Sequence, residues 1–172
     1  MKMNLNDLRL LKVRLEKEVM QLIKQRDEVS IVLISPGENC EDYIDKTVDQ
    51  LTEEIAEYNL ALVMINDVLT KANVDASVEF NGTKYTLANA LYKVKQCRQE
   101  AAKLENFGKK LPRRRENSYG NNANVVYVAT YNIKAYEEYA KELKNDNDEM
   151  SKLIDEINQK YIVEIDEEKI PK

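Results

Sequence analysis

Glycine and proline, the residues that most often interrupt helices, are scarce in this chain and lie far apart. Its 172 residues include only seven of them: Gly37, Gly82, Gly108, Gly120, Pro36, Pro112 and Pro171. A glycine-rich phosphate loop needs two or three glycines close together, so that the backbone can approach the phosphates. No two glycines here lie within ten residues of one another. The sequence therefore excludes Walker-type and dinucleotide-fingerprint enzymes, and any bound phosphate must be held by side chains.

The composition narrows the possible functions further. The chain has no histidine and no tryptophan, which removes histidine-based catalytic triads and histidine-ligated zinc or di-iron centres. Hydrophobic residues make up 43% of the chain and charged residues 33%, a combination that favours amphipathic helices over disorder. The net charge of -5 argues against DNA, RNA or an anionic membrane as the main partner.

Two further features predict the cellular compartment. Cys40 and Cys97 lie far apart in the sequence and form no C-x-x-C pair, so we expect reduced thiols rather than a disulfide or a metal site. The N-terminal residues 1–17 carry charges throughout, and the longest uncharged apolar-rich run, residues 59–66, is far shorter than the ~20 residues of a membrane span. We therefore expect neither a signal peptide nor a membrane helix, and a cytoplasmic location.

Apolar residues recur every three or four positions over most of the chain, which is the spacing of an amphipathic helix. The pattern predicts a mainly α fold, an antiparallel bundle of about four long helices at 5–29, 41–73, 87–107 and 132–161. The second segment is too long for one compact globule and should pack against the first helix across the Pro36-Gly37 turn. We expect a single helical domain over residues 1–163, followed by a charged, frayed tail over 164–172.

Two short segments predict β structure. The apolar period changes to two around Asn81-Gly82, where both residues accept the positive φ of a type I′ turn, and this predicts a hairpin over 77–86. Residues 125–130 are rich in valine and predict one extra strand, which we expect to pair with that hairpin. Between the third helix and the extra strand lies a long basic loop over 108–124.

The basic loop is the one place where positive charge gathers. Residues 109–115 hold five basic side chains, and the rest of the protein, with 21 basic and 31 acidic residues, carries -10. Guanidinium groups suit phosphate, aromatic faces suit a base, and amides suit the edges of its ring. The sequence therefore predicts an anion or nucleotide site formed by Arg113, Arg114, Arg115, Tyr119, Asn121, Asn122 and Tyr127. The alternative is a solvated loop whose charge only offsets the acidic helices.

No group of residues forms a recognisable catalytic set. Closely spaced carboxylates occur in 53–57 and 137–142, where spacings of three or four residues place two of them on one helix face. Because lysines lie nearby and histidine is absent, we interpret these carboxylates as solvent-facing charged stripes rather than acid–base pairs or metal ligands. No serine or cysteine has a recognisable base partner. We therefore expect a non-enzymatic protein without a catalytic residue, a metal or a cofactor.

The segments follow one another in a characteristic order. A helix rich in leucine and arginine leads to a Pro-Gly-Glu turn and a long helix with Ile65-Asn66 near its end. Asn81-Gly82, Thr86-Leu87, a basic loop, a Val-Tyr-Val strand and a closing helix come next. Over nearly the whole chain this layout resembles the septicolysin-like family, small helical proteins of bacteria and their phages. The resemblance implies an oligomeric helical bundle with a small β element, and a largely uncharacterised activity despite a name that suggests cytolysis.

These observations lead to three hypotheses for function. The first is a non-enzymatic, homo-oligomeric binder of a small phosphate-bearing ligand; Asn147, a polar residue within the apolar stripe of the last helix, is of the kind that sets oligomeric state. If the chain is phage-encoded, it would act in the host cytoplasm as a sponge that sequesters a nucleotide immune signal. The second is a helical protein–protein interaction adaptor, which predicts an exposed apolar stripe in the assembled protein. The third is a membrane-active, cytolysin-like protein, against which the mixed charges of the polar faces argue.

Overall fold

A computed structural model describes residues 1–115 and 126–171 of the chain. Four helices make up most of this part: α1 (Leu5–Val29), α2 (Val48–Asp75), α3 (Leu87–Gly108) and α4 (Ile133–Lys160). Short antiparallel strand pairs accompany them, so the mainly α class is confirmed. The residues group into two compact units, Met1–Ala76 with Ile157–Lys172, and Ser77–Glu156. The expected single domain over 1–163 stays a prediction.

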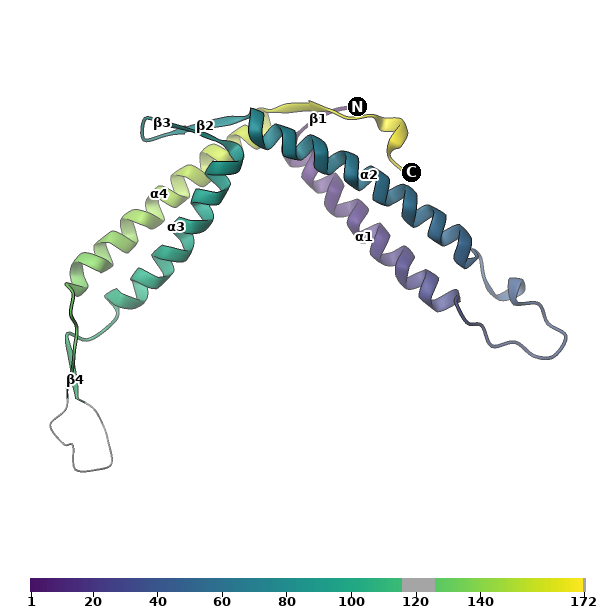
Figure 1. Cartoon of the computed structure of the whole chain (residues 1–172), viewed down its shortest axis with the longest axis horizontal. Coiled ribbons are helices and arrows are strands. Elements are labelled where there is room, and N and C mark those ends of the chain that lie inside the picture. The colour runs from purple at the N-terminus through teal and green to yellow at the C-terminus, as the bar shows by residue number, and fades with distance from the viewer. Residues whose placement is uncertain (116–125, 172) are drawn as a thin grey trace. The chain divides into compact units, whose positions relative to one another are not determined.

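In the first unit, α1 and α2 lie side by side as an antiparallel pair (Figure 1). Three hydrogen bonds of 3.4 Å cross the pair: Arg9–Asn73, Lys12–Asn66 and Arg26–Thr52. Residue numbers rise along α1 as they fall along α2, which is the antiparallel order. The buried apolar side chains of the two helices include Leu5, Leu8, Leu15, Leu51, Ile55, Ala61, Ile65 and Leu69. The predicted packing of the second helix on the first is confirmed.

The second helix begins later than the sequence pattern predicts. Instead of starting at residue 41, α2 starts at Val48, because Thr47 and Gln50 form a capping box. The Thr47 hydroxyl accepts a hydrogen bond from the Gln50 N–H at 3.2 Å, and the Gln50 side-chain oxygen accepts one from the Thr47 N–H at 2.9 Å. Cys40–Tyr43 is instead a short 3-10 helix. The connection between α1 and α2 is therefore much longer than a tight turn at Pro36-Gly37.

The segments near the two ends of the chain pair with each other. β1 (Lys2–Asn4) and β6 (Ile162–Glu164) are antiparallel. The amino group of Met1 also donates to the Ile165 carbonyl at 2.7 Å, and the Ile165 side chain is buried. The expectation of a frayed tail from residue 164 is therefore wrong for the residues up to 171. Val163 and Ile165 alternate with the charged Glu164 and Asp166, so the two apolar side chains point to one face of the chain. The high charge of the segment makes this alternation easy to miss in the sequence.

The second unit begins with the hairpin predicted over 77–86. In it, β2 (Ser77–Phe80) and β3 (Thr83–Thr86) pair antiparallel, so that only Asn81 and Gly82 form the turn. Both turn residues have the expected positive φ, 49° and 73°. The Thr86 hydroxyl then caps α3 by accepting a hydrogen bond from the Asn89 N–H at 3.2 Å. The hairpin prediction is confirmed.

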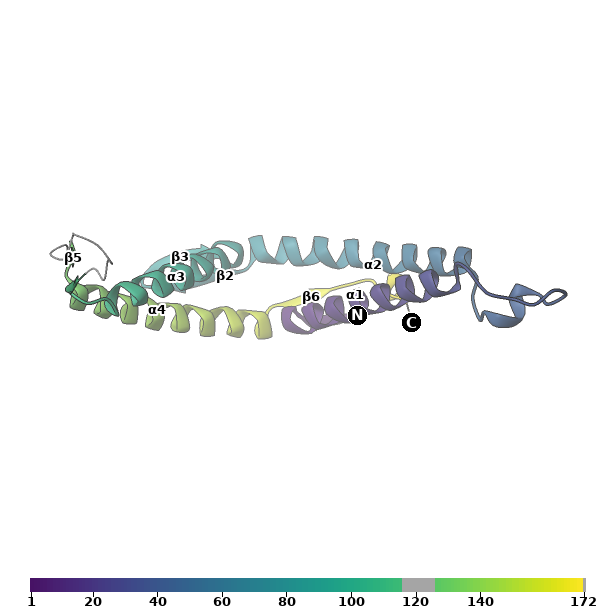
Figure 2. The same ribbon diagram turned by 90° about the horizontal axis from the view of Figure 1, so that it is seen from below.

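In the same unit, α3 and α4 lie side by side (Figure 1 and Figure 2). The Lys144 ammonium group of α4 lies 2.6 Å from a carboxylate oxygen of Glu105 on α3. Gly108 permits a close approach of the two helices, because a Cβ at this position would lie 3.0 Å from the Cα of Glu137. Asn147 is buried within the apolar stripe of α4. Among the helices that the structure describes, none is long and apolar enough to cross a membrane.

The extra strand pairs with a different partner from the one predicted. β5 (Val126–Val128) pairs antiparallel with β4 (Arg113–Arg115), a segment expected to be loop, and does not pair with the hairpin at 77–86. A backbone hydrogen bond of 3.0 Å from the Ala129 N–H to the Pro112 carbonyl extends the pair. Strands that follow one another in sequence usually pair, and valine favours β structure. The arginine segment therefore forms a strand as the partner of the valine-rich one.

Candidate anion-binding site

The arginines predicted to bind phosphate lie in a short hairpin beyond the ends of α3 and α4 (Figure 1). We term residues 109–115 and 126–131 the basic hairpin. It contains β4, β5 and the residues that join these strands to the two helices. Because the helices hold both of its ends, the basic hairpin presents its side chains from a defined platform.

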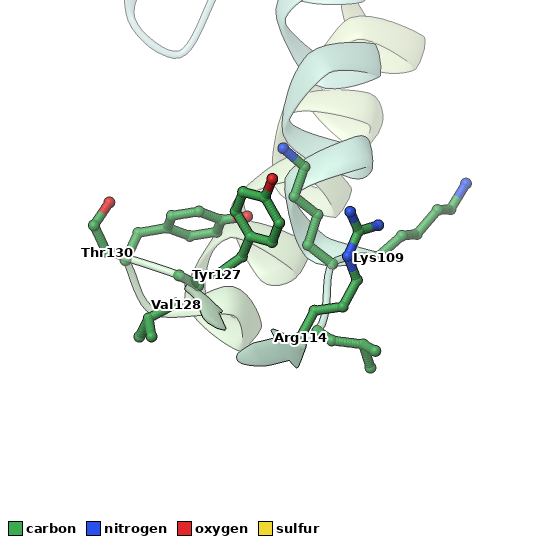
Figure 3. A pocket seen from close by; sticks show the side chains of 9 residues that line it. Lys109, Arg114, Tyr127, Val128 and Thr130 are labelled. Atoms are coloured by element: carbon green, nitrogen blue, oxygen red, sulfur yellow. The ribbon is translucent and has the colours of Figure 1, made fainter. Parts of the chain in front are cut away.

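The strand register divides the three arginines between two faces. Arg114 lies opposite Tyr127, whereas Arg113 and Arg115 lie opposite valines. Because successive side chains of a strand alternate between faces, Arg114 and Tyr127 share one face, and the other two arginines share the opposite one. The guanidinium carbon of Arg114 lies 5.3 Å from the centre of the Tyr127 ring, which is a cation–π contact. Figure 3 shows both side chains extending from the strands toward the helix ends.

An open pocket of about 540 Å³ lies against the face that carries Arg114 and Tyr127 (Figure 3). Its lining combines three cations, Lys109, Lys110 and Arg114, with the phenol rings of Tyr127 and Tyr131. The other two arginines of the basic hairpin do not line it. The volume lies within the range of small-molecule sites, about 300–1,000 Å³. The pocket therefore joins positive charge to aromatic surface in a space that fits a nucleotide-sized molecule.

Three aromatic rings support the base of the basic hairpin. The ring centres of Phe107, Tyr131 and Tyr136 lie 5.4, 6.1 and 5.2 Å apart in tilted or edge-on pairs. The Tyr131 hydroxyl donates a hydrogen bond to the Phe107 carbonyl at 3.1 Å. The Lys110 ammonium group lies 5.2 Å from the centre of the Phe107 ring. These contacts connect the end of α3 to the start of α4 and hold the pocket wall in place.

The cations of the basic hairpin differ in how far they are already neutralised. The Lys109 ammonium group lies 2.8 Å from a carboxylate oxygen of Glu105, which also pairs with Lys144. Hydrogen bonds from Lys109 and Lys144 lower the pKa of Glu105 to about 2. By contrast, no carboxylate within 1–115 and 126–171 forms an ion pair with Arg113, Arg114 or Arg115. The arginines are therefore the better anchors for an incoming anion.

The structure brings together only part of the predicted site. Arg114 and Tyr127 meet at the pocket, Arg113 and Arg115 face away from that pair, and Tyr119, Asn121 and Asn122 lie outside the described residues. The sequence interpretation missed Phe107 as a support. Its position directly before the helix-ending Gly108 was the available signal. Among the described residues, no cluster of cysteine, aspartate and glutamate is arranged to hold a metal ion.

Comparison of the chain with protein-family models, with curated proteins and with solved structures gave no match. The resemblance to the septicolysin-like family therefore stays a prediction. What the protein does has to be argued from its own residues, and the pocket of the basic hairpin is the feature that combines suitable charge, shape and aromatic surface.

Proposed function

We propose that this protein is a non-enzymatic, homo-oligomeric binder of a small ligand that carries a phosphate group. The observation that carries the proposal is the Arg114–Tyr127 pair at the pocket of the basic hairpin. A guanidinium group can hold a phosphate through two parallel hydrogen bonds, and a tyrosine ring offers a stacking surface to a base. The two side chains together match a ligand with a phosphate and a planar group, such as a nucleotide.

The electrostatic setting of the pocket supports this proposal. The protein carries a net charge of -5, whereas residues 109–115 alone hold five basic side chains. An anion is therefore drawn to this hairpin rather than to the acidic helices. Among the described residues that line the pocket, the charged side chains are all cationic: two ammonium groups and one guanidinium group. Such groups suit binding better than proton transfer, in keeping with a binder rather than an enzyme.

Isothermal titration calorimetry with linear nucleotides, cyclic nucleotides and sugar phosphates tests the proposal. Arg114→Ala should weaken binding roughly 10- to 100-fold, because a hydrogen bond to a charged group contributes about 1.5–3 kcal/mol. Tyr127→Ala should weaken nucleotides about tenfold, through lost stacking, and leave sugar phosphates unchanged. The matched control is Arg14→Ala, which removes an exposed arginine of α1 and should bind as the wild type does.

Two results would contradict the proposal. One is the absence of heat with every compound of the panel. The other is unchanged affinity after Arg113, Arg114 and Arg115 are all replaced by alanine. Release of a reaction product during incubation with a bound nucleotide would contradict the non-enzymatic part, which liquid chromatography of the incubated mixture measures.

A narrower form of the proposal is that the protein sequesters a nucleotide immune signal. In that form, a cyclic nucleotide should be the tightest ligand of the panel and should leave the protein unmodified. Mass spectrometry of small molecules released from the protein, after expression in cells with active signalling, identifies the natural ligand. Recovery of common phosphate metabolites alone would contradict this form while leaving phosphate binding intact.

A helical adaptor is the second candidate, and one observation favours it. Leu60 and Val63 are 72% and 60% exposed on the side of α2 away from its buried stripe. A cysteine placed there by Leu60→Cys can be labelled with a thiol reagent and compared by peptide mapping with the exposed native Cys40. Equally fast labelling in the purified assembly supports an open adaptor face. Protection of the new cysteine means that another copy covers the face, which contradicts the adaptor.

A further inference from the structure

The connection between α1 and α2 exposes a run of apolar side chains. Ile31 is 88% exposed, Leu33 95% and Ile34 41%. The connection projects beyond the ends of both helices (Figure 1 and Figure 2). Single exposed apolar residues are common on protein surfaces, whereas several in succession at a projecting tip are typical of an interaction surface. Docking of a partner would remove this apolar area from water.

The chain around the apolar run has a defined conformation. Pro36 and Gly37 turn the backbone, with Gly37 at a φ of 95°. The Glu38 carboxylate accepts hydrogen bonds from the Tyr43 side chain and from the Ser35 N–H, the second at 2.8 Å, and both bonds lower the pKa of Glu38. A segment that is already shaped in this way loses less conformational freedom on docking than an unstructured loop does.

Acidic side chains predominate beside the apolar run, and one of them, Glu28, forms an ion pair with Lys24 at 3.4 Å. We term residues 27–45 the acidic tip, which covers the last residues of α1 and most of the connection. It contains six acidic side chains and no lysine or arginine. A surface that fits the acidic tip must therefore combine exposed apolar side chains with several cations and few carboxylates.

The basic hairpin of the same chain has such a surface. Arg113 and Arg115 lie on the face opposite the Arg114–Tyr127 pair. Leu111 and Val128, from the same hairpin, are 66% and 60% exposed, and both also line the pocket. We infer that the acidic tip of one copy docks on the basic hairpin of a second copy. The apolar run then lies against the exposed leucine and valine, and the carboxylates lie near the two arginines.

The two docking surfaces differ, and each copy carries one of each. Two copies can form this contact twice, in a reciprocal two-fold dimer, or each copy can join the next in a ring or a filament. This contact deepens the proposed function and rests on its homo-oligomeric part; because Leu111 and Val128 also line the pocket, the docked copy lies next to the ligand site. Attraction between exposed charges is screened over about 10 Å at 0.1 M salt, so assembly should weaken as the salt concentration rises.

Sedimentation velocity of the full chain tests the contact with two variants. Ile31→Ser/Leu33→Ser removes apolar side chains from the acidic tip, and Arg113→Glu/Arg115→Glu reverses the charge of the hairpin face. All four side chains are exposed, so both variants should keep the helical circular dichroism of the wild type. The wild type should self-associate, and each variant alone should do so only at concentrations at least about tenfold higher.

An equimolar mixture of the two variants is the sharpest measurement. One variant keeps its basic hairpin and the other keeps its acidic tip, so a single contact can form and a 1:1 dimer should appear. The matched control is Leu10→Ser, which removes an exposed apolar side chain of α1 and should assemble as the wild type does. Four results would overturn the inference: a monomeric wild type, variants that assemble like the wild type, loss of assembly in Leu10→Ser, or a mixture without a dimer.

Calorimetry on the same proteins separates this contact from the ligand site. Arg114→Ala should bind nucleotides roughly 10- to 100-fold more weakly and still assemble, because its side chain lies on the other face of the hairpin from Arg113 and Arg115. The Ile31→Ser/Leu33→Ser variant should lose assembly and still bind. Nucleotide binding without a mixed dimer overturns the contact alone. A mixed dimer without nucleotide binding overturns the ligand site alone.

Discussion

Each unit of this protein has a tip at which a pair of helices is connected, and the two tips are built differently. The acidic tip has no strand pairing, and hydrogen bonds to one carboxylate, that of Glu38, shape its turn. The basic hairpin is strand-paired and rests on three aromatic rings. In the acidic tip the apolar side chains are therefore exposed, whereas in the basic hairpin much of the aromatic surface supports the structure.

This difference separates the residues that hold each tip from those that the tip offers to a partner. In the basic hairpin, Phe107, Tyr131 and Tyr136 support the fold, while the arginines are exposed. In the acidic tip, Ile31 and Leu33 are exposed, so their side chains add little buried surface to the fold. The same kind of substitution, such as tyrosine to alanine, should therefore change the free energy of unfolding by different amounts at the two tips.

The largest difference is expected for tyrosine. Tyr131→Ala removes two ring contacts and the hydrogen bond to the Phe107 carbonyl, and it should lower the free energy of unfolding by about 2 kcal/mol. Tyr43→Ala removes an exposed ring of the acidic tip and its hydrogen bond to the exposed Glu38 carboxylate, so it should cost clearly less than Tyr131→Ala. Urea unfolding followed by circular dichroism measures both values. Tyr131→Phe keeps the ring, so its cost in free energy of unfolding should lie between those of Tyr131→Ala and Tyr43→Ala. Equal costs for Tyr131→Ala and Tyr43→Ala would contradict the difference between the tips.

The same comparison shows which parts of the fold could be predicted from the sequence. Asn81-Gly82 and the apolar repeats of the helices act through neighbours a few residues away, so the hairpin and the helices were predictable. The pairing of Arg113–Arg115 with Val126–Val128 joins segments more than ten residues apart, and consecutive arginines carry no period. α2 starts late because the capping box of Thr47 and Gln50 fixes its first residue at Val48, whereas the apolar repeat already begins before that residue.

For the candidate site, the sequence located the basic residues but could not assign their faces. A shift of one residue in the strand register would exchange Arg114 with its neighbours, so their division requires the pairing itself. The support given by Phe107 to Tyr131 also depends on the end of one helix meeting the start of another. Charge patterns therefore predict where a ligand is attracted, whereas the packing of the tip decides which arginine meets it.

A glycine substitution at the acidic tip should have the next largest effect. Gly37 has a φ of 95° and no atom within 4 Å of an added Cβ, so the cost of Gly37→Ala comes from the backbone alone. A left-handed conformation costs a non-glycine residue about 1–2 kcal/mol, and we expect about 1.5 kcal/mol from urea unfolding. Gly37→Asn is the control, because asparagine tolerates this region better and should cost less. Equal costs for alanine and asparagine would mean that the left-handed turn is not maintained in solution.

Replacing Gly108, the glycine near the basic hairpin, should also lower the free energy of unfolding, but through side-chain crowding and by a smaller amount than replacing Gly37. At Gly108 an added Cβ meets the Cα and Cβ of Glu137 at 3.0 Å. Overpacking costs about 1–3 kcal/mol, while alanine gains up to about 1 kcal/mol in helix propensity, so Gly108→Ala should destabilise by about 1 kcal/mol. Gly108→Val adds crowding and gains less helix propensity than alanine does, so it should cost clearly more in the same urea titration. A stabilised Gly108→Ala variant would show that α3 and α4 do not approach closely at this point.

The smallest effect is the acid dependence of stability beside the basic hairpin. Lys109 and Lys144 lower the pKa of Glu105 to about 2 in the folded protein, below the value of about 4.3 for an unfolded glutamate. A lowered pKa means that the ion pairs stabilise the fold above about pH 4.3 and that this stabilisation is lost as the pH falls toward 2. Glu105→Gln should therefore be less stable than the wild type at pH 7, and the difference in unfolding midpoint should disappear between about pH 4.3 and pH 2. Because this carboxylate is exposed, the difference should also shrink in high salt. A difference that persists unchanged to pH 2 would mean that Glu105 acts through packing, and that the lysines beside the basic hairpin are not held by its charge.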